Sequence, residues 1–180
     1  MAVQETDERE INGLHPDKLE EVIEGLKDPG ALKEFSGPWR TRVVWDGGFR
    51  AKAHMRTHTL AFDEPAGLDT QDTAASAHEI LLSAVGSCMM VGFLLNATRQ
   101  GVRIDNLEIA VEANFENILK WAGLHETGNP GYGGVKAKVY VKADADEATL
   151  REIWQKAVDG SPVTQSVARA TPIETDFEAL

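Results

Sequence analysis

The single cysteine of the chain, Cys88, is the residue best suited to chemistry, and it stands in an unusually apolar stretch. Residues 80–98 contain no charged side chain. A free cysteine on an apolar helix is most often a buried packing residue. It becomes a nucleophile only as the thiolate, which a neighbouring cation or a helix N-terminus stabilises. The sequence therefore leaves two interpretations of Cys88 open, a packing residue and a reactive thiol.

A reactive Cys88 would need help from elsewhere in the chain. It stands about nine residues into the helix predicted around it, beyond the useful reach of the N-terminal dipole. A guanidinium from another element would therefore have to stabilise the thiolate. Arg50 and Arg56, on the strands predicted before the helix, are the candidates. An acidic side chain would be needed to aim either of them.

The histidines do not predict a metal site. His54 and His58 face the same side of one predicted strand but stand four residues apart, about 13 Å, which is too far to share one ion. No zinc-type spacing of ligands is present, and we predict neither a metal nor a cofactor. His78, near the start of the predicted helix, is either a capping-turn residue or a proton carrier in a pocket.

Charge and cysteine content exclude several classes of partner. The chain has 180 residues, a formal net charge of -11 and a pI near 4.9. Such a chain repels phosphate backbones and anionic lipid, so we predict no nucleic-acid partner. One cysteine excludes an intramolecular disulfide framework, and the polar, acidic N-terminus lacks the pattern of a secretory signal. These features predict a cytoplasmic protein.

The uncharged stretch is also about as long as a membrane span. Its hydrophobicity is diluted by small and polar residues, and the flanking segments alternate like strands of a soluble domain. The diluting residues are Ser83, Gly86, Ser87, Gly92 and Asn96. We therefore predict a core helix and no membrane partner.

Residues 1–35 are predicted to form an N-terminal helical arm, and residues 36–180 a single domain. After Pro16, apolar residues recur at helical spacing as far as "DPG" at residues 28–30, where we expect this helix to end. Those residues are Leu19, Val22, Ile23 and Leu26. The arm is expected to lie on the core or on a neighbouring subunit, or to act as a lid over a pocket.

The domain is predicted to begin with antiparallel strands and to continue with the long helix. Residues 39–63 alternate with period two around the turn at 46–48, as one long strand or two short ones after that turn. A loop at 63–76 follows, and Ser76 with Glu79 matches a capping box for the helix. The helix is expected to run to about Gln100, with Gly101 as its stop.

Two further strands, a helix and a last strand are predicted after the long helix. Residues 104–115 and 135–143 alternate, and they are separated by a glycine-rich segment. Asp144 and Glu147 match a second capping box before an apolar helical stripe. Residues 171–177, "TPIETDF", match a final strand.

This order predicts an α+β fold with antiparallel sheets packed on a long central helix. The central helix is apolar nearly all round, so we expect it to be enclosed nearly all round. A core of about 140 residues cannot easily wrap some 30 Å of helix, whereas a second subunit can. Gly86 and Gly92 would let another helix backbone approach closely. We therefore predict an obligate homodimer with this helix at its centre.

Two pairs of motifs resemble a known family. "DEPAGLD" followed by "HEILLSAVGSC", and later "SPVTQSV" followed by "PIETDF", resemble the OsmC/Ohr family over residues 39–178. The resemblance implies an intertwined homodimer with active sites at the subunit interface, and reduction of organic hydroperoxides. In that chemistry Cys88 would attack the peroxide and become a sulfenic acid, which a second cysteine recaptures. An Arg and a Glu would hold the thiolate and the peroxide.

The chain departs from the family pattern at two positions. Ser161 stands where the second cysteine is expected, so an external thiol would have to restore Cys88. His78 stands at the position of the catalytic Glu in the hydroperoxide branch, ten residues before the cysteine. Glu79 matches the Glu of the broader OsmC-like branch, and it can equally be a capping residue. Arg56 fits the family strand somewhat better than Arg50.

The resemblance leads to two hypotheses of different classes. In the first, the chain is a one-cysteine thiol peroxidase that reduces an apolar organic hydroperoxide in a dimer pocket lined by His78, Met89, Phe93 and Ser161. In the second, turnover is lost, and the pocket binds an apolar or acyl-like small molecule or the cysteine senses redox state. Whether the protein is an enzyme stays open from sequence.

Overall fold

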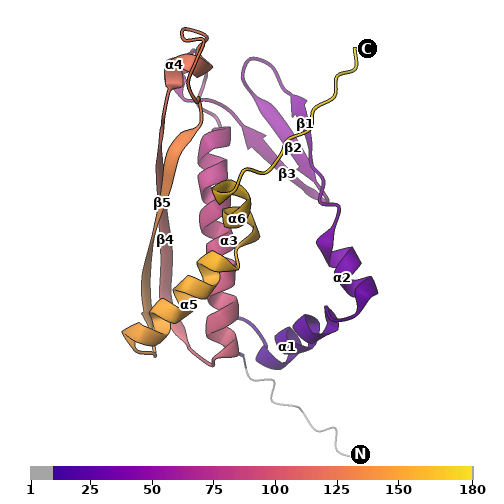
Figure 1. Ribbon diagram of the computed structural model, residues 1–180, viewed down its shortest axis with the longest axis vertical. Helices are drawn as coiled ribbons and strands as arrows, with labels where there is room; N and C mark the ends of the chain where they lie inside the picture. Colours follow the sequence, from indigo (N-terminus) through magenta and orange to yellow (C-terminus); the bar gives the residue numbers. More distant parts are fainter. Residues whose placement is uncertain (1–9, 180) are drawn as a thin grey trace, which may run out of the picture. The chain divides into compact units, whose positions relative to one another are not determined.

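The computed structural model describes residues 10–179, so the first nine residues of the predicted arm lie outside the described part. The described residues form two compact units that meet at Ser83 and Ala84, inside the long helix α3 (Ala77–Arg99). Figure 1 gives the order of the elements. The predicted division between an arm and a domain at residue 35 stays a prediction.

The N-terminal unit begins with two short helices, where one was predicted. Helix α1 (Pro16–Gly25) is the expected one, and α2 (Pro29–Ser36) follows directly. The "DPG" sequence that was expected only to end α1 also starts α2. The Asp28 carboxylate accepts hydrogen bonds from the Gly30 and Ala31 backbone N–H groups at 3.0 and 2.9 Å, which caps α2.

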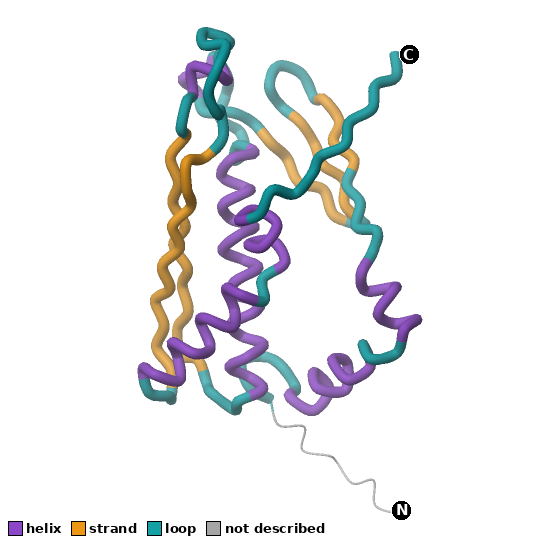
Figure 2. Tube along the Cα trace, viewed as in Figure 1, coloured by secondary structure: helices purple, strands orange, loops and turns teal. Residues whose placement is uncertain are grey.

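A three-stranded antiparallel meander follows, with β1 (Arg42–Trp45), β2 (Ala51–Met55) and β3 (His58–Phe62) in that order. Figure 2 shows the three strands joined by short turns. The second turn corrects the prediction for the histidines. His54 pairs with Thr59 on the neighbouring strand, and His58 pairs with Met55, so the two rings lie on different strands and opposite faces.

The loop after β3 contains a short 3-10 turn, η1 (Ala66–Leu68), and ends in the predicted capping box. The Glu79 carboxylate accepts from the Ser76 backbone N–H at 2.8 Å and from the Ser76 hydroxyl at 3.0 Å. These bonds fix the start of α3. The helix ends at Arg99, and Gly101 follows with a φ of +73°, as predicted for a helix stop.

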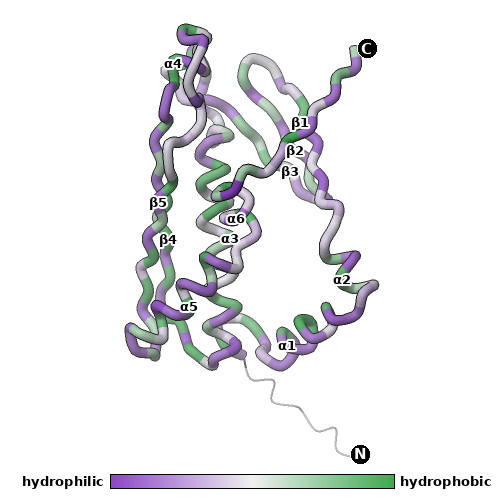
Figure 3. Tube along the Cα trace, viewed as in Figure 1, coloured by the Kyte–Doolittle hydropathy of each residue, from purple (hydrophilic) through white to green (hydrophobic). Residues whose placement is uncertain are grey.

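Helix α3 is long and apolar enough to cross a membrane by length and composition, a test that the core helix of a soluble protein also passes. Hydrophobic turns recur along it in Figure 3. Phe93 and Ala97 have no exposed surface, because they pack in a hydrophobic cluster with the segments that follow α3. The second half of α3 therefore contributes to the hydrophobic core of the C-terminal unit.

The C-terminal unit packs the second half of α3 against a long two-stranded ribbon and a helix. Strand β4 (Ile104–Phe115) pairs antiparallel with β5 (Tyr132–Ala143), and the connection between them contains a short helix, α4 (Ile118–Trp121), that was not predicted. Helices α5 (Glu147–Asp159) and α6 (Pro162–Ala168) follow. The buried cluster consists of Phe93, Ala97, Val102, Ile153 and Ala157.

The two glycines of α3 make the close approaches expected of them, but within the chain. A Cβ atom at Gly86 would lie 3.1 Å from the Val111 side chain on β4, and one at Gly92 would lie 3.1 Å from the Ala157 Cα on α5. The backbone that approaches Gly92 is therefore α5 of the same chain, and the neighbour of Gly86 is strand β4. The glycines give no support to a dimer.

Gly92→Ala should destabilise the protein measurably. The added methyl would also lie 3.3 Å from the Ala157 carbonyl oxygen, so α3 and α5 must move apart and loosen the core. We expect a loss of about 1–3 kcal/mol in the free energy of unfolding, measured by urea denaturation. Gly25→Ala on α1 is the matched control, because nothing lies within 4 Å of the added atom. An unchanged midpoint for Gly92→Ala would contradict this packing.

Two predictions for the C-terminal unit are wrong. Asp146, and not Asp144, caps α5, accepting from the Thr149 backbone N–H at 2.7 Å, while Asp144 accepts from the Arg103 N–H. Residues 171–177 form no strand, and Ile173 is 86% exposed. A strand needs a hydrogen-bonded neighbour, and none of residues 10–179 pairs with this segment.

Candidate functional site

Cys88 is half-buried on α3 and is a free thiol. One side of the helix around it is enclosed, since Met89 is 5% exposed and Phe93 is not exposed at all. The other side is open, and Val91 is 66% exposed. Cys88 lies at the border between these two sides. A side chain in that place is reachable and also has an apolar environment, as a thiol that meets an apolar substrate requires.

Met89 and Phe93 lie on the enclosed side of the helix. Phe93 belongs to the hydrophobic cluster of the C-terminal unit, in contact with the elements that cover α3. In the described residues both side chains act as packing. Their role as walls of a substrate pocket stays a prediction.

His78 and Glu79 form a hydrogen-bonded network with Ser76 at the start of α3. Ser76 is 3% exposed, and its hydroxyl lies 3.0 Å from Glu79 Oε2 and 3.2 Å from His78 Nδ1. The hydrogen bonds from the Ser76 backbone N–H and hydroxyl hold the pKa of the Glu79 carboxyl below its usual value. Glu79 is therefore an ionised and positioned carboxylate.

The position of Glu79 relative to Cys88 follows from the helix that carries both. Nine residues correspond to about 13 Å along the axis and to two and a half turns. The two side chains therefore leave opposite faces of α3, far apart. No single copy of this helix can bring the Glu79 carboxylate to the Cys88 thiol.

Arg50 lines a small cavity of about 200 Å³ in the N-terminal unit, between the β1–β2 turn and the loop after β3. Its guanidinium donates to the Asp46 carbonyl oxygen at 3.2 Å. Asp63 lines the same cavity and is 1% exposed. Arg56 has no such surroundings. It is exposed in the β2–β3 turn, with an unusual positive φ of 53°.

We expected an acidic side chain to orient the arginine of the site. Asp63 is such a neighbour of Arg50, although the sequence alone did not indicate it. Its carboxylate accepts from the Thr73 backbone N–H at 2.9 Å, from the Thr73 hydroxyl at 2.8 Å, and from the Glu64 N–H. These bonds, led by those from Thr73 and aided by the charge of Arg50, hold the pKa of Asp63 below its usual value. The feature of the sequence that could have indicated Asp63 is its position as the first residue of the "DEP" motif.

The depressed pKa of Asp63 makes stability depend on acid pH. A carboxyl with a lower pKa in the folded state stabilises the fold above its unfolded pKa, and this contribution is lost as the pH falls from about 4 through the folded value. Asp63→Asn should lower the thermal midpoint at pH 7. It should also flatten the decline in midpoint below pH 4, measured by circular dichroism. An equal shift of the thermal midpoint at every pH would contradict a lowered pKa of Asp63 in the folded protein.

Ser161 is buried and serves as a helix cap. It is 1% exposed, and its hydroxyl oxygen accepts from the Thr164 backbone N–H at 3.2 Å and from the Thr164 hydroxyl at 2.8 Å. Pro162 occupies the first helical position of α6. The residue thus has a complete structural role at the position where the family pattern expects a cysteine.

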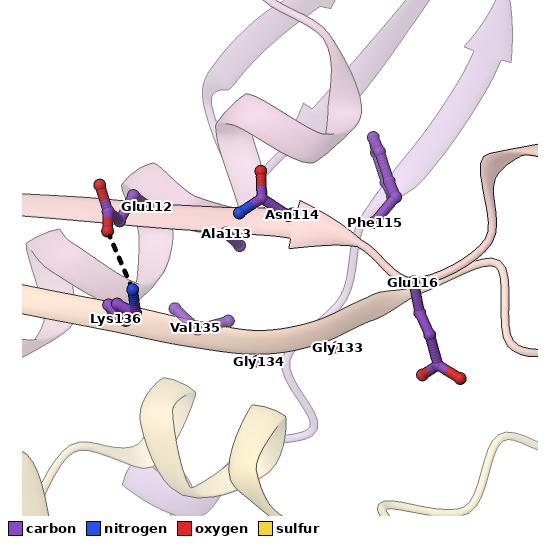
Figure 4. A pocket seen from close by; sticks show the side chains of 9 residues that line it. All are labelled: Glu112, Ala113, Asn114, Phe115, Glu116, Gly133, Gly134, Val135 and Lys136. Atoms are coloured by element: carbon purple, nitrogen blue, oxygen red, sulfur yellow. Dashed lines mark ion pairs between the residues drawn. The ribbon is translucent and has the colours of Figure 1, made fainter.

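A second cavity lies at the end of the β4–β5 ribbon, near the turn that contains α4. It has a volume of about 360 Å³, and Figure 4 shows its lining side chains, including the ion pair between Glu112 and Lys136 at 3.6 Å. None of the predicted site residues lines it. Within residues 10–179, no group of three or more His, Cys, Asp or Glu side chains is placed to hold a metal ion.

The structure thus brings the predicted residues together in separate groups. His78 and Glu79 share the Ser76 network, while Arg50 shares a cavity with Asp63. Cys88, Met89, Phe93 and Ser161 belong to the C-terminal unit. Arg56 joins none of these groups.

Comparisons with known proteins agree with the fold. A sequence model of the family described as OsmC-like protein matches residues 70–176. An OsmC-like protein from Mycoplasma pneumoniae is similar in structure, with a TM-score of 0.63 and 14% identity over 74% of this chain and 89% of that chain. The sequence comparison with curated proteins gave no match.

Two other solved structures are similar and are named for hydroperoxide resistance. The organic hydroperoxide resistance protein OsmC from Legionella pneumophila has a TM-score of 0.54 and 13% identity, over 73% of this chain and 90% of that chain. The organic hydroperoxide resistance protein from Elizabethkingia anophelis, with thiocyanate bound, has a TM-score of 0.51 and 11% identity, over 73% of this chain and 89% of that chain. At these identities the likeness shows a shared fold.

Proposed function

Because the chain belongs to the OsmC-like protein family, we propose that it reduces organic hydroperoxides through Cys88, as a homodimer that uses an external thiol as reductant. The observation that carries the proposal is the place of Cys88. It is a free, half-buried thiol on the border between the enclosed and the open side of α3. The neighbours named organic hydroperoxide resistance proteins supply the substrate class.

The proposed reaction begins with the Cys88 thiolate. It attacks one peroxide oxygen, the O–O bond breaks, and Cys88 becomes a sulfenic acid while an alcohol leaves. Ser161 has no sulfur with which to form a disulfide, and its hydroxyl is engaged at the start of α6. An external thiol must therefore attack the sulfenic acid, and a second thiol must release Cys88.

A second copy of the chain is needed to complete the site. Glu79 and Cys88 leave opposite faces of one helix, so a site that contains both takes Glu79 from the other copy. Arg50 is proposed as the guanidinium, because it already has a cavity and an acidic neighbour in Asp63, and Arg56 is the alternative. The open side of α3, with Val91 exposed, is the proposed contact surface between copies.

The C-terminal segment offers further apolar surface to a second copy, since Ile173 and Phe177 are 86% and 88% exposed. The apolar surroundings of Cys88, with His78, Met89, Phe93 and Ser161 as proposed lining, suit an apolar hydroperoxide in a cytoplasmic protein.

Turnover with added thiol tests this function. The purified protein is mixed with an alkyl hydroperoxide and an excess of a dithiol, and the hydroperoxide remaining is measured over time. Consumption of many equivalents per chain supports the proposal. Consumption of one equivalent or none, with either a dithiol or a monothiol, contradicts it.

One observation favours a second candidate function. Ser161 and Glu79 both cap helices through their hydrogen bonds. A protein that has lost the catalytic roles of these two positions would keep such structural roles. The protein would then bind an apolar or acyl-like molecule, or register redox state by stopping at the sulfenic acid. Cys88→Ser would leave binding of such a molecule nearly intact, and would remove a redox response.

A further inference from the structure

A third cavity, the β5–α5 groove, lies in the C-terminal unit between strand β5 and helix α5. Its volume is about 740 Å³, within the range of about 300–1,000 Å³ that is usual for small-molecule sites. It contains none of the residues assigned to the hydroperoxide site. The lining residues are Ala137, Lys138, Val139, Tyr140, Val141, Ala145, Glu147, Leu150, Arg151 and Trp154.

The apolar part of the β5–α5 groove is the outer layer of the hydrophobic core. Four of the lining side chains also pack against the buried cluster of the unit, namely Val139, Val141, Leu150 and Trp154. Each of the four is only partly buried, so it contacts the core and still has surface to offer in the groove. A ligand would therefore meet an apolar surface that is already formed before it binds.

Lys138 is the lining residue that lacks a partner of opposite charge. The lysines on either side of it along the exposed face of β5, Lys136 and Lys142, each form an ion pair with a carboxylate of β4. Lys138 lies opposite Ala110, which offers no charge. Its ammonium instead lies over the Tyr140 ring, 4.7 Å from the centroid. Among residues 10–179 it forms no ion pair with a carboxylate.

Arg151 is a second cation of the groove lining. Its Nε donates to the Glu147 carboxylate at 2.9 Å, and its Nη2 donates to the same oxygen. A guanidinium has five N–H donors, so others remain for a ligand. Two cations and one carboxylate give the lining a local positive charge, in a chain whose net charge is -11. The groove is thus a place where an acidic protein accepts an anion.

We propose that the β5–α5 groove binds a monocarboxylate with an alkyl chain, of the fatty-acid type, with the carboxylate beside Lys138 and the chain against Leu150 and Trp154. Charge complementarity selects this occupant, because an unpaired cation adjoins an apolar surface. The lining part of β5, residues 137–141, is about 13 Å long, which suits a chain of medium length. This inference does not depend on the proposed function, since Cys88 takes no part in it.

Calorimetric titration of the full chain tests the head group and the chain of the ligand separately. The probes are decanoate, decanol and hexanoate, each below the concentration at which it forms micelles. We expect one decanoate to bind per chain, and hexanoate to bind at least about tenfold more weakly, because it buries fewer methylene groups. Lys138→Gln should weaken decanoate binding about three- to fivefold, as is typical of an exposed ion pair, and leave decanol binding unchanged.

Lys142→Gln is the matched control for Lys138→Gln. Lys142 is exposed on the same face of the same strand but does not line the groove, so its replacement should leave decanoate binding unchanged. Lys138→Arg keeps the charge and should bind decanoate nearly as the parent does. Circular dichroism establishes that the variants remain folded. Equal effects of Lys138→Gln and Lys142→Gln would overturn the proposal, as would a parent protein that does not bind decanoate.

Tryptophan fluorescence tests where the ligand binds. Trp154 lines the groove, whereas Trp39, Trp45 and Trp121 do not. Decanoate should therefore change the fluorescence of the parent protein. In Trp154→Phe, which keeps an aromatic ring on the core, this change should disappear while calorimetry still detects binding. A fluorescence change that persists in Trp154→Phe would place the ligand elsewhere in the protein and would overturn the assignment of the groove.

Discussion

Replacing Cys88 by Ser is expected to abolish thiol-dependent consumption of organic hydroperoxide. A serine hydroxyl at neutral pH is not a nucleophile toward a peroxide, and the chain has no other cysteine to substitute for it. We expect the rate to fall to that of the thiol alone, a loss of about 1,000-fold or more, as is usual when a nucleophile is removed. Hydroperoxide consumption with excess dithiol is the measurement.

Serine is close to cysteine in size, so the fold should remain. Met90→Leu, two residues further along α3, is the matched control, because Met90 is also half-buried and the substitution conserves volume. It should retain most of the activity. Activity in Cys88→Ser at more than a few per cent of the parent would show that the chemistry lies elsewhere.

The substitution Val91→Glu is expected to dissociate the proposed dimer. Val91 is 66% exposed in the middle of an apolar helix, on the face opposite the buried Met89 and Phe93. A carboxylate placed between two copies would lose its water without gaining a partner. We expect the dimer dissociation constant to rise about 100-fold, which corresponds to about 3 kcal/mol, measured by sedimentation equilibrium.

Val22→Glu on α1 is the control for Val91→Glu. Val22 is 55% exposed on a helix that buries no residue, and the same change in charge there should leave the association unchanged. If the dimer carries the active site, Val91→Glu should also lose activity in parallel with association, and high protein concentration should restore part of it. A monomeric parent protein with full activity would contradict the proposed site.

Local patterns in the sequence predicted most of the elements. The period-two alternation gave the strands, and Ser76 with Glu79 marked the start of α3, because capping depends on residues three apart. Short helices were harder to predict. In α2 the same Asp-Pro-Gly that ends one helix begins the next, and no periodicity develops over eight residues. Helix α4 is only one turn long.

Features that depend on tertiary partners could not be predicted from spacing. Gly92 was expected to face another subunit, but α5 lies against it, and only the fold shows which helix approaches. Residues 171–177 have the pattern of a strand and no neighbour to pair with among the described residues. The histidines were misplaced because a turn at Arg56 separates two strands that the alternation alone could not divide.

The same limit applies to the candidate site, because some of its residues are recognised only from their tertiary neighbours. Cys88 and Glu79 followed from motifs, whereas Asp63, the acidic neighbour of Arg50, became apparent only through its burial and its bonds to Thr73. The contact between His78 Nδ1 and the Ser76 hydroxyl likewise depends on side-chain directions that a sequence does not contain.

The rate at which Cys88 is oxidised by an organic hydroperoxide, compared with free cysteine at the same pH, tests the central claim most directly. The unmodified, sulfenic and more oxidised forms of the intact chain are separated by mass spectrometry as the reaction proceeds. An activated thiolate predicts a rate at least about 1,000-fold above that of free cysteine. A rate no faster than that of free cysteine would mean that Cys88 is a packing residue of α3, and would contradict the proposed chemistry.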